Sequence, residues 1–154
     1  MKKIFKILPL LGLLSVSLLT GCTNQEEKYH YEDGTYKGMS QKHEKDESGV
    51  GAGYATCTIV VSDEKLESCV FVLYELDGTV KDEEYGKYDE NGVEYSKDSY
   101  LKAQKAIQAA VRYAKTLIEN QKLTDDDVIS GATITLSECI EAVDDALKDA
   151  KVIE

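Results

Sequence analysis

The chain has 154 residues, and 29 Asp and Glu against 18 Lys and Arg give it a formal net charge of −11. This length predicts a single domain. The acidity argues against a nucleic-acid partner, because such binding depends on Lys and Arg side chains that neutralise phosphates. The 42% share of hydrophobic residues excludes both a disordered acidic tail and an all-apolar membrane protein.

The first 21 residues have the pattern of an export signal. Lysines at positions 2, 3 and 6 precede an apolar run over 7–19. The run is too short to span a bilayer, which takes roughly 20 apolar residues, but it fits the apolar core of a signal peptide. It ends in Leu19-Thr-Gly-Cys22, which resembles a bacterial lipobox, where the cysteine is lipidated and the preceding peptide removed. An ordinary signal peptide with a chance cysteine is the alternative.

The lipobox hypothesis divides the chain into a signal peptide (1–21), a polar tether (22–31) with lipidated Cys22, and a folded domain (32–152). Loss of the signal peptide leaves 15 basic and 29 acidic residues, a net charge of −14. Acyl chains such as palmitate on Cys22 would hold the protein on the outer face of the bacterial cell membrane, since two chains suffice for stable anchoring.

The domain begins with residues typical of strands. Asp33–Gly38 looks like a turn that enters a first extended segment. The segments 54–61 and 66–75 are rich in Val, Ile, Thr, Tyr, Phe and Cys, and Ser62-Asp-Glu-Lys65 separates them, which predicts a β-hairpin. Residues 77–97 form a long polar loop, with a small hairpin expected at Asn91-Gly92.

Two helices follow. The first is predicted over 98–121, capped by Asp98 or Ser99, with Ile107, Val111, Ala114 and Ile118 buried against the sheet. Thr135-Leu-Ser-Glu138 has the spacing of a capping box and is predicted to open the second helix. The fold class is therefore α+β, a small antiparallel sheet packed against two main helices.

Three cysteines remain if Cys22 is lipidated. Pairing Ser62 with Lys65 would place Cys57 and Cys69 on opposite faces of the hairpin, and a one-residue change of register would bring them together. We interpret the three thiols as small buried hydrophobes. The sequence predicts no metal site, because it has no CxxC or Cys/His ligand spacing, and its acidic runs at 82–84 and 125–127 lack the spacing of an EF-hand.

Hydroxyl side chains and a glycine lie between the two predicted helices, in the segment 124–135. The free N–H groups and the positive end of a helix dipole form a natural anion site. Gly131 would allow a ligand to approach the backbone closely. The alternative interpretation is that these residues only cap the helix.

The stretch Asp127-Val-Ile-Ser130-Gly-Ala-Thr133-Ile-Thr135 resembles the D-x-x-S-G-A-T-x-T flavinylation motif of the FMN-binding domain family. This family includes flavin-carrying components of the sodium-pumping NADH:quinone oxidoreductase and of the related Rnf-type complex, together with small lipoproteins of extracellular electron transfer. The segment Asp33–Gly38 also resembles the start of the family's domain. The chain departs from the pattern at Leu136, where many members have Ser, and at the Asp-Glu hairpin turn, where Asp-Gly is common.

The resemblance implies FMN joined through its phosphate to Thr133 by a phosphoester bond. Asp127 would belong to the sequence that a flavin transferase recognises. The other motif residues, which would line the phosphate, are Ser130, Gly131, Ala132 and Thr135. The expected function is that of a lipid-anchored electron carrier, without catalysis of its own, that exchanges electrons with membrane redox partners such as a quinone-linked donor. The alternatives are a non-redox lipoprotein binding module and a reductase with dissociable FMN.

Overall fold

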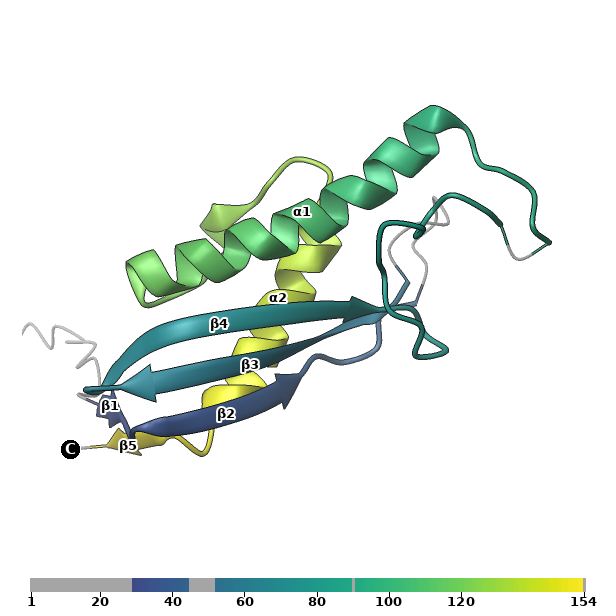
Figure 1. Ribbon diagram of the computed structural model, residues 1–154. Helices are drawn as coiled ribbons and strands as arrows, with labels where there is room; N and C mark the ends of the chain where they lie inside the picture. The colour runs from purple at the N-terminus through teal and green to yellow at the C-terminus, as the bar shows by residue number, and fades with distance from the viewer. Residues whose placement is uncertain (1–28, 45–51, 90, 154) are drawn as a thin grey trace, which may run out of the picture.

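The computed structural model describes residues 29–44, 52–89 and 91–153. The predicted signal peptide (1–21) and Cys22 lie outside these residues. The elements, in chain order, are β1 (Tyr29–Tyr31), β2 (Gly34–Met39), β3 (Tyr54–Ser62), β4 (Lys65–Tyr74), α1 (Lys97–Asn120), the 3₁₀ turn η1 (Asp125–Asp127), α2 (Thr133–Leu147) and β5 (Lys151–Ile153). The predicted α+β class is confirmed, with antiparallel strands and two main helices (Figure 1).

The three-stranded sheet has the order β2-β3-β4, and both helices cover the same face of it. The helix α1 runs along β4, and α2 packs against β2 and β3, behind them in Figure 1. In β3 every second residue is buried under the helices, which gives the alternation expected of a sheet with one covered face. Of the helices that the structure describes, none combines the length and apolar character needed to cross a bilayer.

Gly38 brings α2 close to the sheet. A Cβ atom at this position would overlap the main-chain oxygen of Ala142 on α2. The neighbouring Cys57 Sγ lies 3.1 Å from the same oxygen. The glycine of the segment Asp33–Gly38 therefore allows the close contact between β2 and α2.

The β3–β4 hairpin is confirmed, and its strands take the alternative register, shifted by one residue, that brings Cys57 and Cys69 to the same face. Ser62 pairs with Lys65 as expected, and then Val61 pairs with Leu66 while Val60 pairs with Ser68, so Glu67 is an extra, bulged residue. A bulge moves every later pair by one residue and so changes the face on which each side chain lies. Cys57 consequently faces Phe71, Cys69 faces Ile59, and both sulfurs lie on the helix-covered face.

The three cysteines of the described region are free thiols. Burial raises the pKa of Cys57 to about 11 and that of Cys69 to about 12, and it raises the pKa of Cys139 further. Thiols with raised pKa values are poor nucleophiles at neutral pH. Their environment agrees with the interpretation as small buried hydrophobes, in which Cys57 and Cys139 belong to the main core.

The folded part starts before residue 32, within the segment predicted to be the tether. Tyr29–Tyr31 forms β1, which pairs antiparallel with β5 at the far end of the chain. Glu32 N–H also donates to the main-chain oxygen of Ala150, at 2.9 Å. Three-residue strands have no detectable periodicity, so this pairing between the two ends of the domain gives no local sequence signal.

The helix α1 begins one residue earlier than predicted and buries a different stripe. Its N-cap is Ser96, whose Oγ accepts a hydrogen bond from Ser99 N–H, so the predicted caps Asp98 and Ser99 are wrong. Val111, predicted to be buried, is 70% exposed, because α1 contacts both β4 and α2 and turns another side toward them. The residues buried on α1 are Ala109, Ala110, Tyr113 and Leu117; Ile107, Ala114 and Ile118 are half-buried.

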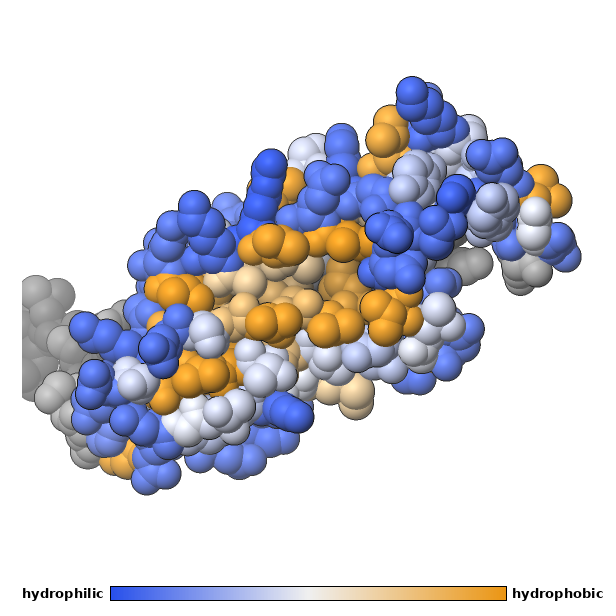
Figure 2. Space-filling model, viewed as in Figure 1, coloured by the Kyte–Doolittle hydropathy of each residue, from blue (hydrophilic) through white to orange (hydrophobic). Residues whose placement is uncertain are grey.

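The half-buried stripe of α1 borders an apolar groove. The opposite wall is the edge of β4 at Cys69, Val70 and Phe71. Figure 2 shows the apolar side chains gathered between α1 and β4 along this groove. No residue of the stretch 127–135 lines it, so the groove is separate from the motif.

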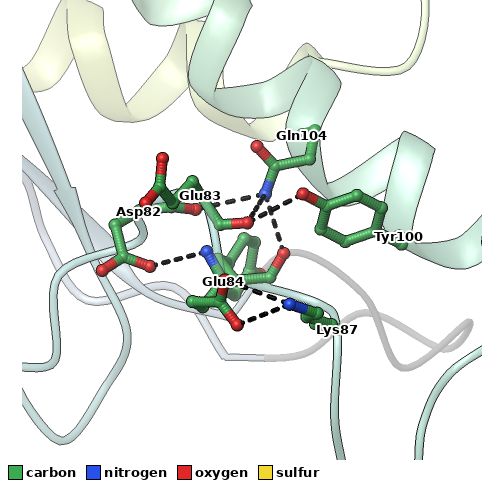
Figure 3. A network of polar contacts seen from close by, with 7 residues as sticks. Asp82, Glu83, Glu84, Lys87, Tyr100 and Gln104 are labelled. Carbon is green, nitrogen blue, oxygen red and sulfur yellow. Dashed lines mark hydrogen bonds and ion pairs between the residues drawn. The ribbon is translucent and has the colours of Figure 1, made fainter.

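The long polar loop is held against the first half of α1. The side-chain amide of Gln104 donates to the main-chain oxygens of Asp82 at 3.1 Å and Tyr85 at 2.9 Å, and the Tyr100 hydroxyl donates to that of Glu83 at 2.8 Å (Figure 3). Further along the loop, an antiparallel bridge between Tyr88 and Glu94 confirms the small hairpin at Asn91-Gly92.

Candidate functional site

The motif residues lie on a tight turn that leads directly into α2. The Ala132 N–H donates to the Ile129 oxygen at 2.9 Å, which closes a four-residue turn. Gly131 has a φ of +84°, whereas the φ of Ser130 is negative. This combination is a type II turn, which requires glycine at its third position. Ser130 and Gly131 are exposed at the apex.

The helix α2 starts at Thr133, so the predicted capping box at Thr135–Glu138 is wrong. Ala132 is the N-cap, and its oxygen accepts the first helical hydrogen bond, from Leu136 N–H at 3.0 Å. The turn passes directly into the helix, which places Thr135 in the first helical turn. Glu138 lies in the second turn and is only 1% exposed, among core side chains.

Three main-chain N–H groups precede the first helical hydrogen bond of α2. The N–H groups of Thr133, Ile134 and Thr135 have no acceptor within the part of the chain that the structure describes, and the N-cap Ala132 has no polar side chain to supply one. The first turn of α2 also contains no acidic residue. Free N–H groups and an uncompensated helix dipole together attract an anion such as a phosphate.

Only some of the residues predicted to bind the phosphate lie at the surface. The side chains of Ser130 and Thr133 are exposed, and neither hydroxyl forms a hydrogen bond to another described residue. Ala132 is 3% and Thr135 is 5% exposed, so their side chains belong to the interior. Of these two residues, Thr135 can offer an anion its main-chain N–H, and Ala132 already uses its N–H in the turn.

Asp127 is engaged in its own turn. One of its carboxylate oxygens accepts hydrogen bonds from the Thr124 N–H at 2.8 Å and from the Thr124 hydroxyl at 3.1 Å. These bonds close the 3₁₀ turn η1, two residues before Ile129. The carboxylate is half-buried and has a local structural partner, in addition to the recognition role that the resemblance implies for it.

Tyr113 is a residue of the site that sequence reasoning missed. Its hydroxyl accepts a hydrogen bond from Ile129 N–H at 3.1 Å and donates one to the Ala132 oxygen at 3.3 Å. The side chain is 1% exposed, and burial raises the pKa of the phenol. A tyrosine on the buried stripe of a helix needs a polar partner, and that requirement was the available signal.

Two buried charged side chains, Glu138 and Lys81, lie outside the motif. Glu138 of α2 is buried near Lys81, which follows β4 and is 6% exposed. Burial raises the pKa of Glu138, and the Lys81 charge opposes the shift; burial lowers the pKa of Lys81. Glu138 Oε1 has no hydrogen-bond partner in the described part of the chain. No three His, Cys, Asp or Glu side chains of that part are grouped so as to hold a metal ion.

No protein-family model and no curated protein matches the sequence. The fold is similar to that of the CPE2226 protein from Clostridium perfringens, known from a crystal structure, with a TM-score of 0.51 and 24% identity over 78% of this chain and 88% of that chain. A solution NMR structure of a protein from Clostridium thermocellum matches with 28% identity over 80% of this chain and 95% of that chain, at a TM-score of 0.40. The first likeness shows a shared fold alone.

Proposed function

We propose that this protein is a lipid-anchored, extracytoplasmic flavoprotein that carries electrons through FMN bound covalently to Thr133. The observation that carries the proposal is the position of Thr133. Its exposed hydroxyl is on the first residue of α2, next to three N–H groups without acceptors in the described structure. The resemblance of the stretch 127–135 to a flavinylation motif supports the same assignment.

The residues present fit a phosphate diester at this position. The N–H groups at the start of α2 would donate hydrogen bonds to the phosphate oxygens, and the helix dipole would offset their charge. Open space surrounds the apex of the turn, since a Cβ atom on Gly131 would meet nothing within 4 Å. Such donors matter in a mature chain with 15 basic and 29 acidic residues, where the overall field repels a phosphate.

Attachment requires an activated flavin nucleotide, because joining free FMN to a hydroxyl would have to expel water in an aqueous medium. The Thr133 Oγ1 would attack the phosphorus of the FMN half of flavin adenine dinucleotide. The Oγ1–P bond forms, the P–O bond of the pyrophosphate breaks, and AMP leaves with the electron pair. The hydroxyl proton passes to a base of the flavin transferase, which this proposal requires as a partner.

The attached flavin would supply the redox chemistry, and the protein would supply attachment, electrostatics and location. We therefore propose an electron carrier without catalysis of its own. Lipidation at Cys22 would keep the carrier at the membrane surface, within reach of a quinone-linked donor.

Protein isolated from its native host tests the proposal. The full chain is denatured, separated from small molecules and measured by visible absorbance and intact-mass spectrometry. We expect flavin absorbance to stay with the chain and the mass to include one FMN less one water. Flavin that leaves on denaturation would identify a reductase with dissociable FMN, and protein without flavin would identify a non-redox binding module; either result contradicts the proposal.

A further inference from the structure

We infer that Tyr113 is a positioning residue for flavin attachment, because its hydroxyl holds the turn that presents Thr133. The inference rests on the proposed function of Thr133. Tyr113 lies on α1, far from the motif in sequence, and its side chain is buried under the turn Ile129–Ala132. It belongs to no part of the motif and contacts none of the exposed motif side chains through its hydroxyl.

The hydroxyl bridges the two ends of the turn. It accepts from the N–H of the first residue, Ile129, at 3.1 Å and donates to the oxygen of the last residue, Ala132, at 3.3 Å. The turn closes on itself between the same two residues, through Ala132 N–H and the Ile129 oxygen at 2.9 Å. Three hydrogen bonds therefore join the two ends of the turn, directly or through one buried oxygen, and fix their separation.

The same carbonyl connects the turn to the helix that follows it. The Ala132 oxygen accepts from Tyr113 and also from Leu136 N–H, the first hydrogen bond of α2. Thr133 is the residue directly after this carbonyl. The direction in which its side chain leaves the helix is thereby set relative to α1, a helix of 24 residues, rather than by the exposed turn alone.

The packing of the Tyr113 ring fixes the position of its hydroxyl. Tyr113 is 1% exposed and is packed in the main core, so the position of its hydroxyl is determined by the surrounding apolar side chains. Phenylalanine could fill the same space but would leave Ile129 N–H without its partner. The turn would then hold its shape through a single internal hydrogen bond and the φ preference of Gly131.

A small change in the direction of Thr133 is expected to slow attachment strongly. Attack on phosphorus requires the hydroxyl in line with the leaving group, and a displacement of about 1 Å can cost a reaction roughly 100-fold in rate. Tyr113 touches neither the flavin nor the reacting atoms in this scheme. Loss of its hydroxyl should therefore lower kcat for attachment and leave KM for the acceptor protein nearly unchanged, because the exposed motif side chains remain the same.

The test is a time course of flavin attachment to the full chain in membranes, with flavin transferase and flavin adenine dinucleotide. In-gel fluorescence under denaturing conditions measures the initial rate at several acceptor concentrations. For Tyr113→Phe we expect kcat to fall at least about tenfold while KM changes little. Tyr100→Phe is the matched control, because it removes one hydroxyl from the same helix, where that hydroxyl donates to the Glu83 oxygen. It should react at the wild-type rate.

A second control separates positioning from stability. Leu117→Val alters the buried face of α1 one turn away and leaves the Tyr113 hydrogen bonds in place. If Leu117→Val lowers the melting temperature as much as Tyr113→Phe but keeps the wild-type rate, the positioning role is supported. The role is overturned if Leu117→Val slows attachment equally, or if Tyr113→Phe reacts like the wild type. A wild-type chain that takes up no flavin overturns the proposed function, and the inference with it.

Discussion

The carboxylate of Asp127 accepts two hydrogen bonds from one residue, Thr124, through both its N–H and its hydroxyl. The two residues close η1, which leads into the turn carrying Ser130. Asp127 would therefore have two separable roles, one in the fold of this segment and one in recognition by the transferase. Separate substitutions of Asp127 and of Thr124 can distinguish the two roles.

Asp127→Asn keeps an oxygen that can accept the Thr124 N–H, so we expect it to lower stability by less than about 1 kcal/mol. Thr124→Val removes the hydroxyl partner and retains the carboxylate. If the transferase reads the charge of Asp127, flavin attachment falls in Asp127→Asn and persists in Thr124→Val. In-gel fluorescence and thermal melting of both variants measure the two effects. Equal attachment in both variants would leave Asp127 with its structural duty only.

The buried pair of Lys81 and Glu138 predicts a pH-dependent stability. Burial raises the folded-state pKa of Glu138 above its ordinary 4.5, so folding favours its protonated form. Its contribution is fully present below the unfolded-state pKa and is lost as the pH rises through the folded-state pKa. Lys81 limits this loss, because its charge attracts the carboxylate.

Lys81→Met removes a positive charge that acts on Glu138 and should destabilise the domain by about 1–3 kcal/mol at pH 8. The deficit in melting temperature relative to the wild type should be smaller at pH 5, where more of Glu138 is protonated. The double variant Lys81→Met/Glu138→Gln should lose this pH dependence. A deficit of the same size at both pH values would show that the Lys81 charge does not act on Glu138.

The exposed fractions on α1 predict opposite outcomes for two apolar residues. Val111 is 70% exposed, so Val111→Asp should change stability by no more than about 0.5 kcal/mol. Leu117 is 1% exposed, and Leu117→Ala should cost about 2–5 kcal/mol through loss of burial and the cavity left behind. Chemical denaturation of the two variants provides the comparison. Strong destabilisation by Val111→Asp would mean that the side of α1 facing the groove is covered in solution.

The elements were predictable where a periodic pattern repeats over many residues. The strands β3 and β4 and both helices have such patterns, whereas the three-residue strands β1 and β5 do not. The sequence left two registers open for the cysteines, and one bulged residue, Glu67, selects the shifted register because it reverses the faces of all later residues. The signal was present, since Glu67 and Ser68 are two successive polar residues that break the alternation of β4.

The position of the candidate site was predictable from its sequence, but the geometry around it was not. Two segments, 124–127 and 135–138, share the spacing of a capping box, and only the first forms one in the structure. The choice depends on where the chain enters α2, which the type II turn at Gly131 decides. The contact with Tyr113 comes from another helix, and the sequence indicates only that a buried tyrosine needs a polar partner, not which residues supply it.

Lipidation at Cys22 remains a prediction of the sequence. Cys22→Ser removes the thiol that would carry the acyl chain, so the variant should be released from washed membranes or remain unprocessed. Membrane fractionation and the apparent mass of the chain give the readout. Normal processing and full membrane retention of Cys22→Ser would contradict the lipoprotein hypothesis and leave the flavin proposal unaffected.

The two threonines at the start of α2 predict different results for flavin attachment. Thr133 is exposed at the first helical position, whereas Thr135 is 5% exposed and turned toward the core. A buried hydroxyl cannot reach a phosphate held by a separate transferase. Thr133→Val keeps the shape of the side chain and removes its oxygen, so it should abolish covalent flavin while leaving the melting temperature nearly unchanged.

Thr135→Val is the matched variant, since it makes the same chemical change two residues further on. It should keep covalent flavin, because its main-chain N–H remains available to the phosphate. Any loss of stability should come from the buried position of the side chain and not from a lost helix cap, because Ala132 is the cap. In-gel fluorescence under denaturing conditions and peptide mass spectrometry decide between the two sites. A fluorescent band in Thr133→Val, or an FMN-bearing peptide modified at Thr135, would overturn the assignment, because the phosphoester forms only at the hydroxyl that attacks the phosphorus.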